Sequence, residues 1–173
     1  MARNVEIKAR IASVEAVEPR AAAIATAGPT PIAQDDTFFR CANGRLKLRA
    51  FADGTGELIF YQRPDSAGPK LSDYRLVPTH QPDALRNALA AAHGVTGRVV
   101  KQRTLYLVGR TRVHLDRVQG LGDFLELEVV LQDDEPVEHG LHEAEALLAR
   151  LGVQPGQLVE GAYVDLLNAA NPA

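Results

Sequence analysis

Charged side chains recur at a spacing of two residues in several short segments of the chain. The sets with this spacing are Glu6 with Lys8, Lys47 with Arg49, Lys101 with Arg103, Glu126 with Glu128, and the run Arg110, Arg112, His114 and Asp116. Because side chains of a β-strand alternate between its two faces, each set lies on one face of a strand. Neighbouring like charges repel unless water or a counter-ion separates them. These faces therefore either meet solvent or surround a bound polyanion and metal.

The opposite faces of the same segments are apolar, which favours the second arrangement. Leu125, Leu127 and Val129 alternate with the acidic pair near the end of the chain. Helices with apolar stripes are expected elsewhere in the sequence and can cover such faces from outside, which leaves the interior of a barrel to the charges. The basic members of this lining would be Lys8, Lys47, Arg49, Arg63, Lys101, Arg103, Arg110 and Arg112.

The acidic residues fall in the first and last expected strands. Glu6 lies in the first, and Glu126 and Glu128 lie in the last. These two strands would be neighbours where a barrel closes. An acidic corner that holds a hard cation, facing a wall of Lys and Arg, suits a triphosphate bound through divalent metal.

Eight strands and four helices are expected from periodicity and turn signals. The strands are expected at 4–11, 36–41, 45–51, 57–63, 74–77, 99–108, 110–118 and 124–131. The helices are expected at 13–27, 82–93, 141–151 and 163–168. Short turns such as Asn43-Gly44 join most of the strands as hairpins. The predicted fold is α+β, a closed eight-stranded antiparallel barrel with flanking helices, although a pair of sheets fits the same strand count.

Composition narrows the class of protein. The chain has 173 residues and a net charge of −3, which fits a single domain over 1–173 and gives no general attraction for nucleic acid. Cys41 is the lone cysteine, so an intramolecular disulfide and a zinc site with several thiolates are excluded. No run of about 18 apolar residues appears, so we expect no membrane span and a cytoplasmic protein. The sequence leaves the oligomeric state open and is compatible with a homodimer.

The ordered set of motifs resembles the CYTH proteins, also called triphosphate tunnel metalloenzymes, and within them the class IV adenylyl cyclase group. The resemblance covers roughly residues 4–167. Its motifs are Asn4-Val5-Glu6-Ile7-Lys8, Gln34-Asp35-Asp36-Thr37-Phe38, Lys101-Gln102-Arg103 through Val108-Gly109, Leu121-Gly122-Asp123-Phe124 with Glu126, and Tyr163 to Leu167. Asn4 stands where the family signature has its first Glu, which removes one negative charge from the metal site.

The resemblance implies an eight-stranded tunnel that binds a nucleoside or organic triphosphate with Mg²⁺ or Mn²⁺. It implies metal ligation by Glu6 and Glu126, with Glu128 as a weaker candidate. It also implies basic tunnel positions at Lys8, Arg49, Arg63, Lys101, Arg103 and Arg112, to which the residue pattern adds Lys47 and Arg110. We expect Glu6, Lys8, Arg112 and Glu126 to serve catalysis.

Several functions remain open at this stage. The expected activity is cyclisation of ATP to cyclic AMP and pyrophosphate, and the alternative is a triphosphatase that hydrolyses inorganic, thiamine or nucleoside triphosphate. Because Asn4 weakens the metal site, a sensor that binds a triphosphate without turnover is a further alternative. His114 lies on the charged face, either as a spacer in the lining or as a general base. Asp116 and Arg112 are a candidate ion pair.

Overall fold

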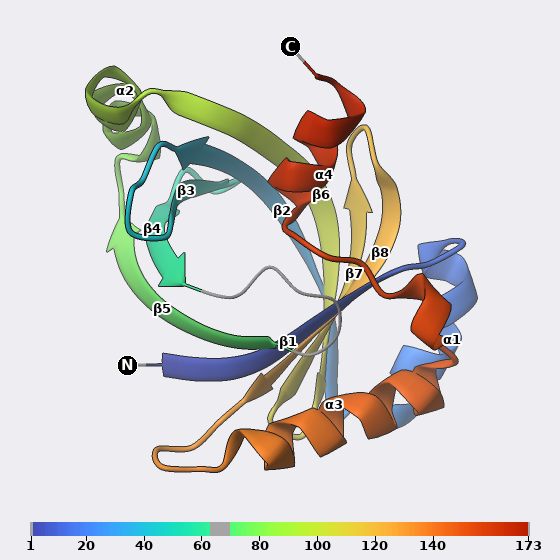
Figure 1. Ribbon diagram of the computed structural model, residues 1–173. Coiled ribbons are helices and arrows are strands. Elements are labelled where there is room, and N and C mark those ends of the chain that lie inside the picture. The colour runs from blue at the N-terminus through green and yellow to red at the C-terminus, as the bar shows by residue number, and fades with distance from the viewer. Residues whose placement is uncertain (1, 63–69, 173) are drawn as a thin grey trace.

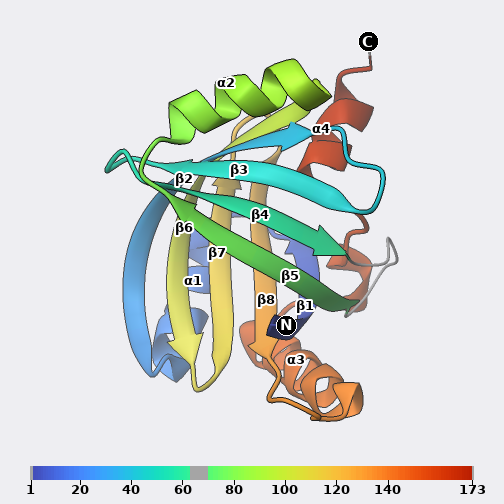
Figure 2. The ribbon, with the colours of Figure 1, turned by 90° about the vertical axis from the view of Figure 1, so that its left-hand side faces the viewer.

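In the computed structural model, which describes residues 2–62 and 70–172, eight antiparallel strands close into a barrel. Their order around the ring is β1-β5-β4-β3-β2-β6-β7-β8 (Figures 1 and 2). The strands are β1 (Ala2–Arg10), β2 (Ala27–Phe39), β3 (Arg45–Phe51), β4 (Gly56–Gln62), β5 (Lys70–Thr79), β6 (Val95–Val108), β7 (Thr111–Val118) and β8 (Gly122–Val130). The helices are α1 (Val14–Ile24), α2 (Pro82–His93), α3 (Val137–Leu151) and α4 (Tyr163–Ala170), with a 3₁₀ turn at Pro155–Gln157. The predicted fold class is confirmed.

The first strand closes the barrel. β1 pairs with β5 on one side and with β8 on the other. In the β1–β8 ladder Glu6 lies opposite Glu128, and Lys8 lies opposite Glu126. The acidic residues of the first and last strands are therefore neighbours, as expected.

The larger hydrophobic cluster lies between the barrel wall and two helices. Figure 1 shows α1 and α3 together on one flank of the ring. They cover the outward faces of β1, β7 and β8, and the cluster includes Val5, Ile7, Val113, Leu115, Leu125, Leu127 and Val129 from the strands and Val14, Val17, Leu147, Leu148 and Leu151 from the helices. Each fully buried side chain of this size stabilises the fold by about 1.5–3 kcal/mol. Because the apolar strand faces point outward, the charged faces of the same strands point into the interior of the barrel.

The C-terminal helix α4 packs against the end of the barrel where β6 begins. A Cβ built on Gly97 would lie 2.4 Å from Val164 Cγ2, so only glycine lets the helix approach this closely. Arg45 on β3 donates to both carboxylate oxygens of Asp165, at 2.9 and 2.7 Å. These contacts fix Tyr163, the first residue of α4, at the barrel interior.

Most elements differ from their expected bounds by up to four residues at an end, and β2 differs by more. The first helix ends at Ile24 instead of residue 27, and β2 begins at Ala27, well before the expected start at residue 36. The start of β2 could not be predicted from its residue types, because Gly28, Pro29 and Pro31 are uncommon within strands. The segment nevertheless pairs with β6. The helix expected at 82–93 has the observed bounds of α2. No helix in the described part of the chain has both the length and the apolar character needed to cross a membrane.

Candidate active site

A cavity of about 300 Å³ runs through the barrel, with lining residues from all eight strands and from the start of α4. Its charged lining residues are Glu6, Lys8, Asp36, Lys47, Arg49, Lys101, Arg103, Arg112, Glu126 and Glu128. All of these except Asp36 were expected at the site from the sequence. Arg63, also expected there, lies outside the described residues. The lumen therefore gathers charge from segments spread over the whole chain.

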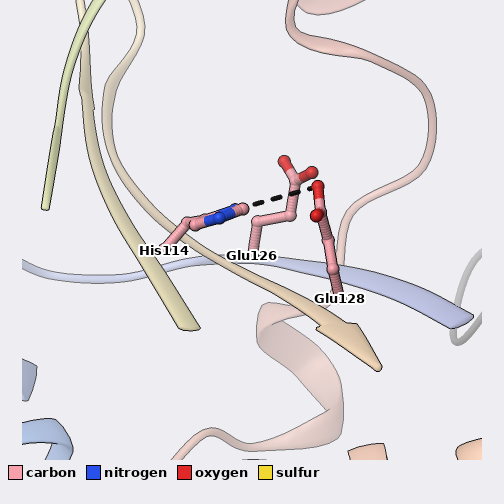
Figure 3. Close-up of side chains that lie close together, drawn as sticks. All are labelled: His114, Glu126 and Glu128. Carbon is pink, nitrogen blue, oxygen red and sulfur yellow. Dashed lines mark ion pairs between the residues drawn. The ribbon is translucent and has the colours of Figure 1, made fainter. Parts of the chain in front are cut away.

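An acidic corner forms on β7 and β8. One ligand atom each from His114, Glu126 and Glu128 lies within 4.8 Å of the others, and Figure 3 shows the three side chains converging. His114 Nδ1 is 3.8 Å from Glu128 Oε1. Burial, with the nearby Arg103 guanidinium, lowers the pKa of His114 to about 4. The imidazole is therefore neutral at neutral pH and can offer a lone pair to a cation.

The three-residue cluster contains some, but not all, of the residues expected as metal ligands. Glu126 and Glu128 belong to it, whereas Glu6 lines the same cavity opposite Glu128 without being part of the three-residue cluster. His114 is the third member of the cluster, although the sequence suggested for it only the roles of a spacer in the lining or a general base. The cross-strand register explains this, because His114 pairs with Glu126 in the β7–β8 ladder.

Glu126 stays ionised despite its burial. Lys8 Nζ lies 3.2 Å from Glu126 Oε2, and Arg103 Nη2 lies 3.7 Å from the same oxygen. Burial alone would raise the pKa of Glu126, but these two cations outweigh it and hold the pKa well below its usual range. The corner therefore carries negative charge at neutral pH.

The basic wall on β3 is held by Asp36, whose role the sequence did not reveal. Asp36 is 1% exposed. It accepts hydrogen bonds from Lys47 Nζ at 2.8 Å and from Arg49 Nε and Nη2 at 2.8 Å each. Although burial opposes it, the charge of Arg49 and Lys47 lowers the pKa of Asp36 well below its usual range. One buried carboxylate thus orients two cations that face the cavity.

A second buried carboxylate, Asp116, orients Arg103. Arg103 donates to both oxygens of Asp116, at 2.7 and 2.6 Å, and the hydroxyl of Tyr163 donates to Asp116 at 2.8 Å. The ring of Tyr163 lies 4.3 Å from Lys8 Nζ and 5.1 Å from Lys101 Nζ. Burial, followed by the charge of Arg103, lowers the pKa of Lys101 to about 7. Helical Tyr163 carries no two-residue spacing, so strand periodicity could not find it.

Two sequence-based assignments are corrected by the structure. Asp116 pairs with Arg103 and not with Arg112, whose Nε instead donates to Glu128 at 2.7 Å. Arg110 does not share the inward face of Arg112. It lies in the turn before β7 and pairs with Glu135 at 2.6 Å and with Glu143 at 2.8 Å. The alternation of the strand does not extend through the turn, so Arg110 lies outside the cavity.

Three buried polar atoms of the lining lack a hydrogen-bond partner among the described residues. They are Asn4 Oδ1, Gln34 Oε1 and His114 Nδ1. A buried polar group without a partner costs free energy, so native structures rarely leave one unmet. His114 Nδ1 belongs to the cluster with Glu126 and Glu128, and two carboxylates beside an unpartnered nitrogen acceptor fit a divalent cation. The lining residues thus fit the metal expected from the sequence.

A family model described as the CYTH domain matches residues 2–163. The chain is 25% identical over 171 residues to the adenylate cyclase CyaB of Aeromonas hydrophila, which covers 92% of this chain and 86% of that protein.

Solved structures show the same fold. The PH1012 protein of Pyrococcus horikoshii superposes with a TM-score of 0.83 at 21% identity, over 95% of this chain and 99% of that one. A Hippeastrum adenylyl cyclase candidate, described as having a dominant triphosphatase activity, superposes with a TM-score of 0.67 at 14% identity, over 100% of this chain and 98% of that one.

Proposed function

The chain belongs to the CYTH domain family, and on that premise we propose that it is a metal-dependent enzyme that converts a nucleoside triphosphate, with ATP cyclisation as its reaction. The observation that carries the proposal is a single cavity with an acidic cluster of His114, Glu126 and Glu128 on one side and oriented cations on the other. Similarity to the Aeromonas adenylate cyclase supports the choice of reaction.

The ligands of Mg²⁺ or Mn²⁺ would be the cluster residues His114, Glu126 and Glu128, with Glu6 lining the same cavity. Carboxylate oxygens are the ligands that these hard cations prefer. Such a cation neutralises charge on the phosphate oxygens and polarises the phosphorus that is attacked. The buried amide oxygen of Asn4 accepts no hydrogen bond from any described residue, so Asn4 would add a neutral ligand or a partner for bound water.

The cations of the lining bind the triphosphate. Arg49 and Arg103 are each held by a buried carboxylate, so their remaining N–H groups are oriented before the ligand arrives. Preorganised donors of this kind stabilise charge that develops in a transition state without reorganising first. Lys8, Lys47, Lys101 and Arg112 supply further positive charge around the phosphates.

In a cyclase, the ribose 3′-hydroxyl attacks the α-phosphorus and pyrophosphate leaves. In a triphosphatase, water attacks the terminal phosphorus, the bond to the bridging oxygen breaks, the diphosphate part of the substrate leaves, and orthophosphate forms. The same lining serves either reaction, because the phosphorus that lies in line with the nucleophile decides the product. The described activity of the Hippeastrum protein makes the triphosphatase the second candidate.

An activity panel tests the proposal. Purified protein is incubated with ATP, thiamine triphosphate or inorganic tripolyphosphate, with Mg²⁺, Mn²⁺ or EDTA, and cyclic AMP, pyrophosphate and orthophosphate are quantified. We expect cyclic AMP and pyrophosphate in equal amounts from ATP, and no product with EDTA. Orthophosphate without cyclic AMP would favour the triphosphatase. Tight metal-dependent binding with the ligand recovered intact would favour a sensor, and absence of both binding and turnover would refute the proposal.

A further inference from the structure

Three aliphatic side chains line the charged cavity without contributing to a hydrophobic core. They are Ile32 on β2, Leu76 on β5 and Leu105 on β6. The described residues form two hydrophobic clusters, and none of the three belongs to either. Leu76 is 43% exposed, which is unusual for a large apolar residue facing a barrel interior. Packing of the barrel therefore does not account for these side chains.

The three residues lie at the same mouth of the barrel. On β2 the lining residues are Ile32, Gln34, Asp36 and Phe38, and Phe38 is at the end near α4. The order on β6 is Leu105, Arg103, Lys101 and Val99, again with the aliphatic residue farthest from α4. Leu76 is likewise the outermost lining residue of β5 on that side. We call Ile32, Leu76 and Leu105 the apolar mouth.

Three consecutive strands of the ring, β7, β8 and β1, present polar groups at this mouth. Arg112, Glu128 and Asn4 are the lining residues farthest from α4 on β7, β8 and β1. These three strands lie between β6 and β5 in the ring, so polar residues that include a candidate metal ligand lie beside Leu105 and Leu76. Arg49 on β3 and Ile59 on β4 line the cavity between Leu76 and Ile32. A ligand that contacts both the apolar and the polar residues must have one apolar part and one strongly anionic part.

Gln34 adds a polar contact next to the apolar mouth. It follows Ile32 by two residues on the same face of β2, and its side chain is buried. No described residue donates to Gln34 Oε1. A ligand that carries a hydrogen-bond donor beside an apolar face satisfies both groups at once, as small-molecule sites commonly do with few polar groups among apolar ones.

We propose that the apolar mouth binds the organic group of the substrate, a flat ring with a hydrogen-bond donor such as a nucleobase, while the triphosphate extends inward toward α4. This inference rests on the proposed function and deepens it, because it assigns the residues that distinguish an organic triphosphate from inorganic tripolyphosphate. Covering Ile32, Leu76 and Leu105 with a ring removes apolar surface from water, a gain that tripolyphosphate lacks.

The test compares two ligands that share the triphosphate. Dissociation constants of ATP and of inorganic tripolyphosphate are measured by calorimetry with Mg²⁺, within a time in which product analysis shows no turnover. Leu76→Ser and Leu105→Ser should each weaken ATP binding about tenfold, the usual range for losing one aliphatic contact, and leave tripolyphosphate binding within about twofold. Gln34→Leu should weaken ATP binding more than tripolyphosphate binding as well.

Val77→Ser is the matched control. Val77 follows Leu76 on β5, is 58% exposed and does not line the cavity, so its replacement should change neither constant. Leu76 is already partly exposed, so its variant should fold, and an unchanged melting temperature checks this. Equal weakening of both ligands, or no change in either, would overturn the inference while the proposed function stands. Failure of the wild-type protein to bind either ligand would refute the proposed function and the inference together.

Discussion

The hydroxyl of Tyr163 donates a 2.8 Å hydrogen bond to Asp116, the carboxylate that also orients Arg103. The last helix of the chain thereby contributes to the lining of a cavity that is otherwise built from strands. Tyr163 also stacks its ring beneath Lys8 and Lys101. The hydroxyl and the ring of Tyr163 contact different partners, so substitutions that remove one or both can separate their effects.

Tyr163→Phe should lower stability by about 1 kcal/mol, the usual cost of one lost hydrogen bond, and reduce kcat/KM because Asp116 and Arg103 become less firmly held. Tyr163→Leu should reduce kcat/KM further, because it also removes the ring beneath the two lysines. Steady-state kinetics with ATP and thermal unfolding measure both effects. Equal kinetics for the two variants would show that the ring does not matter.

Asp36→Asn should destabilise the protein by about 3–5 kcal/mol, because it leaves the buried cations of Lys47 and Arg49 without their carboxylate. Tripolyphosphate with Mg²⁺ should then raise the melting temperature of the variant more than that of the wild type, since the anion replaces the missing charge. Asp35→Asn is the control. Asp35 pairs with exposed Arg98, and its loss should change stability by about 1 kcal/mol or less.

Triphosphate binding should take up a proton from solution near pH 8. Burial and the charge of Arg103 lower the pKa of Lys101 to about 7, so this amine is mostly neutral at that pH in the free protein. A bound polyanion favours the charged amine and raises its pKa, so we expect uptake of up to about one proton that vanishes near pH 6. Calorimetry in buffers of different ionisation enthalpy measures the uptake. It should disappear in Lys101→Met, and persistence in that variant would assign the proton to another group.

Arg112→Ala and Arg110→Ala should differ sharply. Arg112 faces the cavity beside Glu128, and its loss should lower kcat about a hundredfold, as loss of one preorganised donor typically does. Arg110 is a partly exposed partner of Glu135 and Glu143, so its removal should cost about 1 kcal/mol or less and leave kcat nearly unchanged. Rate measurements and thermal unfolding of the two variants separate these expectations. A large rate loss in Arg110→Ala would contradict the observed position.

Glu126→Gln should retain the fold and lose metal-dependent turnover by at least about a hundredfold, because an amide brings no negative charge to the acidic corner. Glu145→Gln on the exposed face of α3 is the matched control and should behave as wild type. Rates at increasing Mn²⁺ concentration check whether the metal requirement has changed. A fully active Glu126→Gln protein would remove Glu126 from the metal site.

Most inward-facing charges could be predicted, because alternation along a strand is a local property. Lys47 with Arg49, and Lys101 with Arg103, needed only the spacing of two residues and the knowledge that their opposite faces are apolar. The prediction failed where the local property ended. Arg110 comes directly before Thr111, the first residue of β7. The chain turns there, so strand alternation no longer determines which way the side chain points.

The partners of these charges were not predictable in the same way. Whether Asp116 pairs with Arg103 or Arg112 depends on the β6–β7 register, which places Arg103 opposite Asp116. The roles of Asp36 and Tyr163 depend on which segments meet in space: Asp36 lies opposite Arg49 in the β2–β3 ladder, and Tyr163 comes from a helix more than forty residues along the chain from Asp116. Such pairings are tertiary facts that periodicity alone does not contain.

The outward orientation of the apolar strand faces has an evolutionary consequence. The larger hydrophobic cluster joins the barrel wall to α1 and α3 and forms an outer shell, none of whose residues lines the cavity. Substitutions among inner residues such as Ile32 or Leu105 can then alter what the protein recognises without dismantling that shell. Selection can diversify the chemistry of the inner shell while the outer shell preserves the architecture.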